Sequence, residues 1–324
     1  MKIIIQLSLI CIIFASCSKS GTTPDPTPAP TPPIPDTLTT GWTKAGTGIP
    51  AAASVSDVYF TTAATGYTTT DMGIFKSTDG GINWSIFNAV TTPFNIGALG
   101  NRYCFVGNDN RIHYTNDGTD FFSKTYFLAD PATPALGFRD CYVASSTIVY
   151  ACSGRYIYKS LNGGANFDSV YVFPSNSTYN YAIFFTSITN GWLMRSDGLY
   201  KTTNGGANWT SVAVLGSGAG AIDFFNAATG LVSDDMHVYK TTDGGASWSM
   251  IFSVPVYGYI DVDMISASEI YLSAANKIYK SVDGGTSFTQ VLSSGQNGIV
   301  EIHFIDANTG WACGKNGAVY RYKP

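Results

Sequence analysis

The octapeptide STDGGINW, at residues 77–84, returns in related form along this chain of 324 residues and governs how the chain folds. The further copies are TNDGTDFF (115–122), SLNGGANF (160–167), TTNGGANW (202–209), TTDGGASW (241–248) and SVDGGTSF (281–288). Consecutive copies lie 38 to 45 residues apart. A period of about 40 residues predicts repeated supersecondary units, each of which buries its apolar face against the next.

A short aromatic segment precedes each octapeptide, as expected of a β-strand that runs into a turn. These segments read GIFK, RIHY, YIYK, GLYK, HVYK and KIYK, and an alternating apolar segment lies about twenty residues upstream of each copy. Aromatic residues make up 14% of the chain and glycine occurs 34 times, which favours strands joined by tight turns over a helical bundle. The spacing predicts four strands in each unit.

The seventh unit is divided between the two ends of the chain. The segment AVYRYKP (318–324) supplies the strand that precedes an octapeptide, and TTGWTKAG (39–46) begins with the tail of one. Trp42 stands where Trp84, Trp209 and Trp248 end their octapeptides. We therefore expect an all-β fold, a single seven-bladed β-propeller with four-stranded antiparallel blades. The N-terminal strand joins the C-terminal blade, because a closed ring removes exposed sheet edges.

The first 17 residues, MKIIIQLSLICIIFASC, predict a lipoprotein signal peptide at residues 1–17. Lys2 precedes an apolar run, and the small residues Ala15 and Ser16 precede Cys17. The ending FASC resembles the lipobox of bacterial lipoproteins, which implies that Cys17 is lipidated and anchors the protein to a membrane. Ser18, by the same resemblance, favours the outer membrane of a Gram-negative envelope, facing the periplasm or the cell surface.

Residues 18–40 are rich in proline and threonine and predict an extended tether. The propeller then occupies residues 41–324. The chain carries 18 basic and 22 acidic residues, for a net charge of −4, so no basic field exists to bind nucleic acid.

The octapeptide resembles the Asp-box, or BNR repeat, whose pattern Ser77, Asp79, Gly81 and Trp84 match. The residues at its acidic position are Asp79, Asp117, Asn162, Asn204, Asp243 and Asp283. A catalytic or metal-binding role would require carboxylates, whereas asparagine replaces aspartate freely as an acceptor of backbone N–H bonds in a turn. We therefore interpret this position as structural.

The longer repeat, with an aromatic residue, a loop, Gly-Trp, an aromatic-Lys pair and the octapeptide, appears in FFTSITNGWLMRSDGLYKTTNGGANW (184–209). It resembles the photosystem II stability/assembly factor family of seven-bladed propellers, which has many bacterial members. The resemblance implies a scaffolding or assembly role and carries over no catalytic residues.

Polar residues gather at the start of the innermost predicted strands. Units six, seven and one are neighbours in the closed ring, and alternation along these strands points their polar residues to one side. The candidate residues at the channel mouth are Asp57, Tyr59, Asp140, Asp261, Asp263, Glu301 and His303. We hypothesise a site for a cation or a cationic ligand, with calcium as the simplest version. The alternative is that each aspartate caps backbone N–H groups at its own strand start, in water.

The loops that lead into the innermost strands carry Phe173, Tyr179, Tyr181, Tyr257 and Tyr259. These rings either form a binding surface for carbohydrate or protein, or pack the joints between blades.

Four cysteines remain besides Cys11 and Cys17. Cys141 and Cys152 lie symmetrically about a predicted hairpin, so a cross-strand disulfide forms between them if both face the same side of the sheet, while Cys104 and Cys313 are expected to be free. No Cys and His spacing suggests zinc.

A glycosidase is the rival class, because Asp-boxes also occur in sialidases and some large β-glucanases. A sialidase needs three convergent arginines, and only Arg139 lies beside an innermost strand. Such glucanases use paired aspartates between two propellers, and one propeller fits here. We therefore expect a non-catalytic, monomeric envelope lipoprotein without a cofactor, acting as a binding or assembly scaffold for a protein or glycan partner. The alternative is a glycoside hydrolase of sialidase-like or β-glucanase-like type, or a glycan-binding surface protein.

Overall fold

The structure is a computed structural model that describes residues 35–90, 93–125, 137–174, 178–213, 220–255 and 258–324. The described residues form strands and turns, and none of them belongs to a helix long and apolar enough to span a membrane. The expectations for the signal peptide, for Cys17 and for most of the tether fall on residues outside this description.

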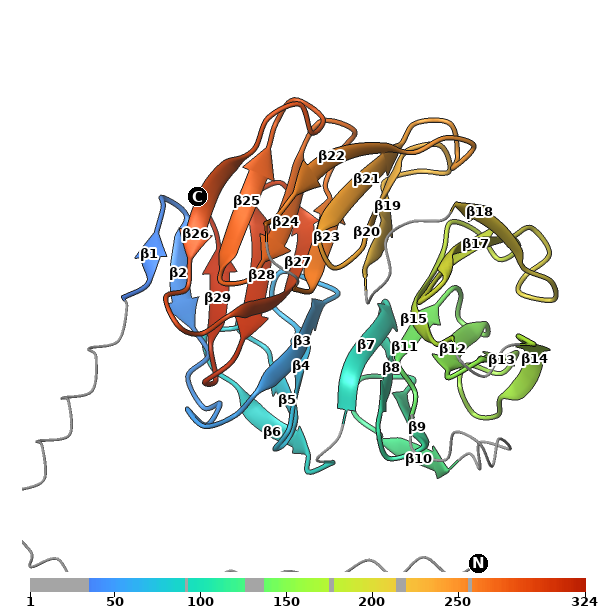
Figure 1. Ribbon diagram of the computed structural model, residues 1–324. Coiled ribbons are helices and arrows are strands. Elements are labelled where there is room, and N and C mark those ends of the chain that lie inside the picture. The colour runs from blue at the N-terminus through green and yellow to red at the C-terminus, as the bar shows by residue number, and fades with distance from the viewer. Residues whose placement is uncertain (1–34, 91–92, 126–136, 175–177, 214–219, 256–257) are drawn as a thin grey trace, which may run out of the picture. The chain divides into compact units, whose positions relative to one another are not determined.

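Seven antiparallel sheets stand in a ring, with the first strand of each sheet nearest the centre (Figure 1). The first three blades are β3 (Val55–Phe60), β4 (Gly66–Thr70), β5 (Gly73–Ser77), β6 (Ser85–Asn88); β7 (Pro93–Leu99), β8 (Arg102–Gly107), β9 (Arg111–Thr115), β10 (Phe122–Thr125); and β11 (Asp140–Val143), β12 (Val149–Ser153), β13 (Tyr156–Ser160), β14 (Asp168–Val172). Blades four and five are β15 (Asn180–Phe185), β16 (Gly191–Arg195), β17 (Gly198–Thr202), β18 (Thr210–Ala213); and β19 (Ile222–Phe224), β20 (Gly230–Ser233), β21 (His237–Thr241), β22 (Ser249–Ser253). Blade six is β23 (Ile260–Met264), β24 (Ile270–Ala274), β25 (Lys277–Ser281), β26 (Thr289–Ser293), and blade seven is β27 (Ile299–Asp306), β28 (Thr309–Gly314), β29 (Val319–Tyr322), β2 (Trp42–Ala45).

The two ends of the chain close the ring, as the sequence predicts. Strand β2 pairs antiparallel with β29, with Trp42 opposite Tyr322 and Ala45 opposite Val319. The Trp42 ring is buried and lies 6.0 Å from Phe304 and 5.3 Å from Tyr322, between centroids. The protein is therefore a seven-bladed β-propeller whose last blade takes its outer strand from the N-terminal end.

The folded unit begins earlier than Gly41, so the sequence-based boundary between tether and propeller was wrong by several residues. Strand β1 (Thr37–Leu38) pairs with β26 and gives blade six a fifth strand. Asp36 accepts hydrogen bonds from Tyr320 Oη at 2.9 Å and from Lys44 Nζ at 3.3 Å. The open edge of β26 offers main-chain donors and acceptors, and pairing with them needs no apolar sequence signal.

The octapeptide turns share one hydrogen-bond pattern. In the first copy, Ser77 Oγ donates to Asp79 Oδ1 at 2.9 Å, and the backbone N–H groups of Gly81 and Asn83 donate to these two oxygens. Equivalent backbone N–H bonds reach Asn162, Asn204, Asp243 and Asp283, whereas Asp117 accepts from the nearer N–H groups of Thr119 and Asp120. The glycine at the fifth position, Gly81, has φ of 88°, which a side chain would strain.

Neighbouring blades are joined at these turns. A lysine on the third strand of one blade donates to the carbonyl of a turn glycine in the next blade. The pairs are Lys76 with Gly118 (2.7 Å), Lys159 with Gly205 (3.1 Å), Lys201 with Gly244 (2.8 Å) and Lys240 with Gly284 (2.8 Å). Between blades seven and one, Trp311 donates to Gly80 O at 2.9 Å and stacks on Phe60, with centroids 3.6 Å apart.

The expected Cys141–Cys152 disulfide is absent, and this prediction was wrong. All four cysteines of the described chain are free and buried, as was expected only for Cys104 and Cys313. In the ladder Asp140 lies opposite Cys152 and Cys141 lies opposite Ala151, so the two cysteines are offset by one residue. A one-residue offset points side chains to opposite faces of a sheet, and the two thiols belong to different core clusters.

Because Trp42 lies in the strand that closes the ring, we predict that replacing it destabilises the folded protein. Replacing a buried tryptophan by alanine costs about 3–5 kcal/mol. We expect Trp42→Ala to lower the free energy of unfolding, measured in urea, about as much as Trp209→Ala, the equivalent change within blade four. A loss for Trp209→Ala alone would mean that the closing strand contributes little to the ring.

Candidate functional site

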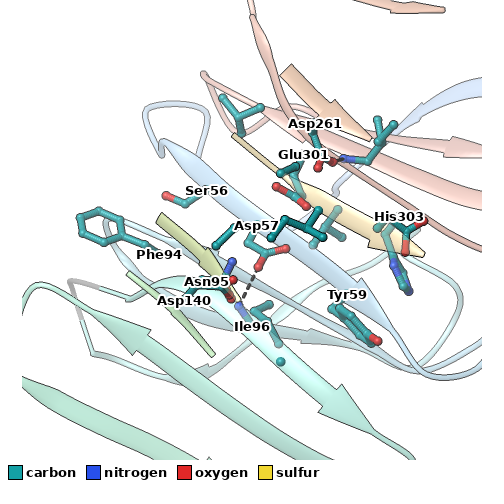
Figure 2. A pocket seen from close by; sticks show the side chains of 18 of the residues that line it. Ser56, Asp57, Tyr59, Phe94, Asn95, Ile96, Asp140, Asp261, Glu301 and His303 are labelled. Carbon is teal, nitrogen blue, oxygen red and sulfur yellow. Dashed lines mark hydrogen bonds between the residues drawn. The ribbon is translucent and has the colours of Figure 1, made fainter. Parts of the chain in front are cut away.

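A cavity of about 670 Å³ lies at the centre of the ring and is lined by the innermost strands of all seven blades. Side chains alternate along these strands, so every second residue faces the cavity. All seven sequence-predicted site residues line it, namely Asp57, Tyr59, Asp140, Asp261, Asp263, Glu301 and His303. Figure 2 shows Asp57, Asp261 and Glu301 turned toward the same space.

The aspartates of the cavity bridge neighbouring blades. Asp57 Oδ2 accepts the backbone N–H of Ile96, in the next blade, at 2.6 Å (Figure 2). The same bond to the next blade is made by Asp140 to Ile183 (2.6 Å), Asp223 to Met264 (2.6 Å), Asp261 to Ile302 (2.8 Å) and Asp263 to Phe304 (2.7 Å). The innermost strands of different blades belong to separate sheets. The carboxyl oxygens therefore satisfy N–H groups that no main-chain ladder reaches.

This geometry agrees with the structural alternative in part and differs from it in two respects. The aspartates cap backbone N–H groups, as the structural alternative held, but the N–H groups belong to the following blade. Asp57 and Asp261 are also buried, each with 4% of its surface exposed, and do not sit in bulk water.

Burial raises the pKa of each of these carboxyl groups. It raises the pKa of Asp140 and of Asp261 to about 7 and that of Asp223 to about 6, against opposing hydrogen bonds from backbone N–H groups. It also holds the pKa of Asp57, Asp263 and Glu301 well above the ordinary value, and nearby carboxyl groups add to the rise. At pH 6, carboxyl groups of the cavity such as Asp140 and Asp261 are therefore still largely protonated, whereas exposed carboxyl groups are ionised.

Burial raises the pKa of Glu301, and the nearby Asp261 carboxyl group raises it further. The basic side chains that line the cavity in the described part of the chain are Arg139 and Lys315, and both are exposed.

His303 and Tyr59 form part of the wall. Their rings stack with centroids 4.1 Å apart, and His303 Nε2 donates to Phe60 O at 2.8 Å. Burial lowers the pKa of His303 to about 4, so the ring is neutral at pH 7. It contributes an apolar face and no positive charge.

Asp223 was not among the predicted site residues, which were chosen around blades six, seven and one, but it lines the same cavity from blade five. Asp223 follows the same alternation as Asp263, and this signal was sufficient to find it. Tyr181 and Tyr259 also line the cavity. Phe173, in contrast, is buried and packs a joint between blades. The guanidinium carbon of Arg195 lies over the Phe173 ring, 3.6 Å from the ring centroid. Tyr257 lies outside the described residues.

Within the described ranges, no three His, Cys, Asp or Glu residues are grouped so as to hold a metal ion. Calcium at the channel mouth stays a prediction.

No protein-family model and no curated protein matches the chain. Among solved structures it is similar to YCF48 from Cyanidioschyzon merolae, with 17% identity and a TM-score of 0.68 over 88% of this chain and 99% of that one. It is similar to YCF48 bound to D1 peptide, with 17% identity and a TM-score of 0.70 over 92% and 100%. A GH74 xyloglucanase from Xanthomonas campestris shares 14% identity and a TM-score of 0.68 over 86% of this chain and 53% of that one. At these identities the likeness shows the propeller fold alone.

The raised pKa values predict how stability depends on pH. The folded state holds the Asp261 proton up to a pKa of about 7, whereas the unfolded chain releases it near 3.8. The stabilisation from this group is therefore complete below about pH 4 and is lost as the pH rises to about 7. His303, with its lowered pKa, acts in the opposite direction between about pH 4 and 6.5.

We expect Asp261→Asn, which keeps an acceptor for Ile302, to gain stability relative to the natural protein as the pH rises from 5 to 8. The gain is up to about 3 kcal/mol, since one pKa unit corresponds to about 1.4 kcal/mol. Because His303 is present in both proteins, its contribution cancels in this difference. Urea unfolding at the two pH values measures it, with Asp168→Asn, an exposed change, as the control. Parallel pH profiles for all three proteins would contradict the assignment.

Proposed function

We propose that this propeller is a non-catalytic binding scaffold that takes a cationic segment of a protein partner at the mouth of its channel. The observation that carries the proposal is the cavity at the ring centre, which gathers six carboxyl groups from five blades: Asp57, Asp140, Asp223, Asp261, Asp263 and Glu301. An ammonium or guanidinium group entering the cavity would let these acids ionise, so that binding supplies the positive partner that the buried acids lack.

The aromatic lining supports a cationic occupant. Tyr59, Tyr142 and Tyr259 line the cavity together with the carboxyl groups. Aromatic faces attract lysine and arginine head groups, most strongly where water is excluded. A cationic side chain is therefore favoured over a neutral one.

A fold-level comparison supports a peptide as the ligand. YCF48, a propeller of similar fold, is known in a complex with a D1 peptide. The similar fold supports a peptide ligand for this chain, and we expect the acidic channel to select a cationic one.

A glycoside hydrolase is the alternative function, and its chemistry needs a pair of carboxyl groups that are free to act on a sugar. Retaining glycosidases hold their two carboxyl groups about 5 Å apart and inverting enzymes hold them further apart, because a sugar or a water must fit between them. The channel aspartates instead use an oxygen each to accept a backbone N–H of the next blade, as Asp57 does from Ile96 and Asp261 from Ile302. We therefore prefer the scaffold to the hydrolase.

The location of the scaffold belongs to the same proposal. The sequence of residues 1–17 supports export and lipidation at Cys17, and residues 18–40 support a tether. A propeller held in this way meets its partner in the cell envelope.

A lysine-rich peptide titrated into the propeller at pH 6 tests the proposal by calorimetry. We expect binding with release of protons, detected as heats that differ between buffers of different ionisation enthalpy, because a bound cation lowers the pKa of the cavity acids. The double variant Asp261→Asn with Glu301→Gln is expected to bind at least about 30-fold more weakly, since losing one partner of a buried charge pair costs about 2 kcal/mol or more.

Two controls complete this experiment. Asp120→Asn with Asp168→Asn removes the same charge from exposed positions and is expected to leave binding unchanged. A glutamate-rich peptide is expected not to bind. Equal peptide affinity of both double variants would show that the peptide binds outside the channel. Binding of calcium or of a neutral glycan, with no binding of the peptide, would contradict a cationic peptide as the ligand.

A further inference from the structure

Blade two departs from the repeat at one buried position on its third strand. In the other blades this position holds Phe75, Tyr158, Tyr200, Tyr239, Tyr279 and Tyr320. In blade two it holds His113, which is fully buried, pairs with Phe105 on β8 and stacks on Phe121 with centroids 5.4 Å apart. An imidazole therefore stands where the other blades have a phenyl or phenol ring.

Both nitrogens of His113 have partners. Nε2 lies 2.8 Å from Asp109 Oδ2, in the turn between β8 and β9, and Nδ1 lies 2.7 Å from Ser123 Oγ, directly opposite on β10. Burial alone would raise the pKa of Asp109, but the hydrogen bond from His113 and the backbone N–H of Arg111 outweigh it, and the pKa falls below the ordinary value. Asp109 is therefore ionised and accepts a hydrogen bond from the Nε2–H group of His113. In the neutral ring Nδ1 is then the acceptor, and the Ser123 hydroxyl donates to it.

The other blades show which part of this arrangement is structural. Tyr200 and Tyr239 donate to Asp197 and Asp234 in their own hairpins at 3.2 Å, so a phenol is sufficient to bond the hairpin carboxylate. A phenol has no second group directed at the outer strand. The bond between His113 and Ser123 is thus an addition that packing and the hairpin do not require.

We propose that Ser123 is a base-activated nucleophile that accepts an acyl group from small carboxylic esters, with His113 as its base and Asp109 as the positioning residue. Ser123 is exposed on the outermost strand of blade two, so an ester carbonyl reaches it from solvent. The inference is independent of the channel and of its proposed ligand.

The chemistry follows from the hydrogen bonds. As Ser123 Oγ attacks the carbonyl carbon, the Oγ–C bond forms and the hydroxyl proton moves to His113 Nδ1. The ester C–O bond then breaks, and the leaving alkoxide takes that proton from the imidazolium. The products are acyl-Ser123 and a free alcohol, and the negative charge of Asp109 stabilises the imidazolium between the two steps.

The propeller supplies internal controls for this reaction. Ser169 and Ser211 occupy the corresponding exposed position in blades three and four, and they lie opposite Tyr158 and Tyr200 in place of a histidine. They share the exposure and strand position of Ser123 and lack a base.

The test is acylation of the folded protein by p-nitrophenyl acetate, with the modified serines identified and timed by peptide mass spectrometry. Because a positioned general base contributes about a hundredfold or more, we expect Ser123 to be acetylated about a hundred times faster than Ser169 and Ser211. His113→Tyr, which installs the residue found in five other blades, is expected to fold and to reduce the Ser123 rate to that of the control serines. Asp109→Ala is expected to slow the acetylation of Ser123, and Asp109→Glu is expected to restore part of that rate.

Acetylation of Ser123 at the rate of Ser169 and Ser211, including no detectable acetylation of any of them, would overturn the proposal. An unchanged Ser123 rate in folded His113→Tyr would also overturn it, because the base would then have no part in the reaction.

Discussion

The unpaired edge of each innermost strand is the constraint on which the rest of this propeller depends. Seven strands face one channel, and strands of neighbouring blades belong to separate sheets. Their inward N–H groups need acceptors, because an unpaired buried N–H is costly. Asp57, Asp140, Asp223, Asp261 and Asp263 supply these acceptors from the preceding blade. The aspartates that make the channel acidic therefore also bridge four of the seven joints between blades.

The same carboxyl groups connect structure with the proposed function. Burial makes their ionised form unfavourable and raises their pKa values, so a proton or a cation must accompany them. Protons fill this role at acidic pH. A cationic side chain of a partner would replace them, and binding and protonation would compete for the same oxygens. The lysine bonds to the octapeptide turns act farther from the axis and carry none of this chemistry.

The fold and the position of the site could be predicted from the sequence, because both follow from regular spacings: the repeat of about 40 residues and the alternation of side chains along each strand. The spacing of the octapeptides set the number of blades, Trp42 revealed ring closure, and alternation placed Asp57 and Glu301 in one cavity. Individual side-chain contacts, within and between the blades, could not be predicted, because they do not follow from these spacings. Nothing in the sequence near Asp57 indicates that its carboxyl group accepts a hydrogen bond from the backbone N–H of Ile96, 39 residues later. The register that separates Cys141 from Cys152 depends on the shape of one hairpin, and the Ser123–His113–Asp109 contacts require knowing which strands are neighbours.

Carbon-13 NMR of aspartate carboxyl groups, followed as a function of pH in the folded protein, tests most directly whether the channel carboxyls bridge the blades as buried acids. We expect two resonances, from Asp140 and Asp261, to titrate near pH 7 and one, from Asp223, near pH 6. The turn residue Asp79 is expected to titrate below the ordinary value, because Asn83 donates hydrogen bonds to it. Titration of every aspartate near pH 4 would contradict the buried bridges and the binding site built from them.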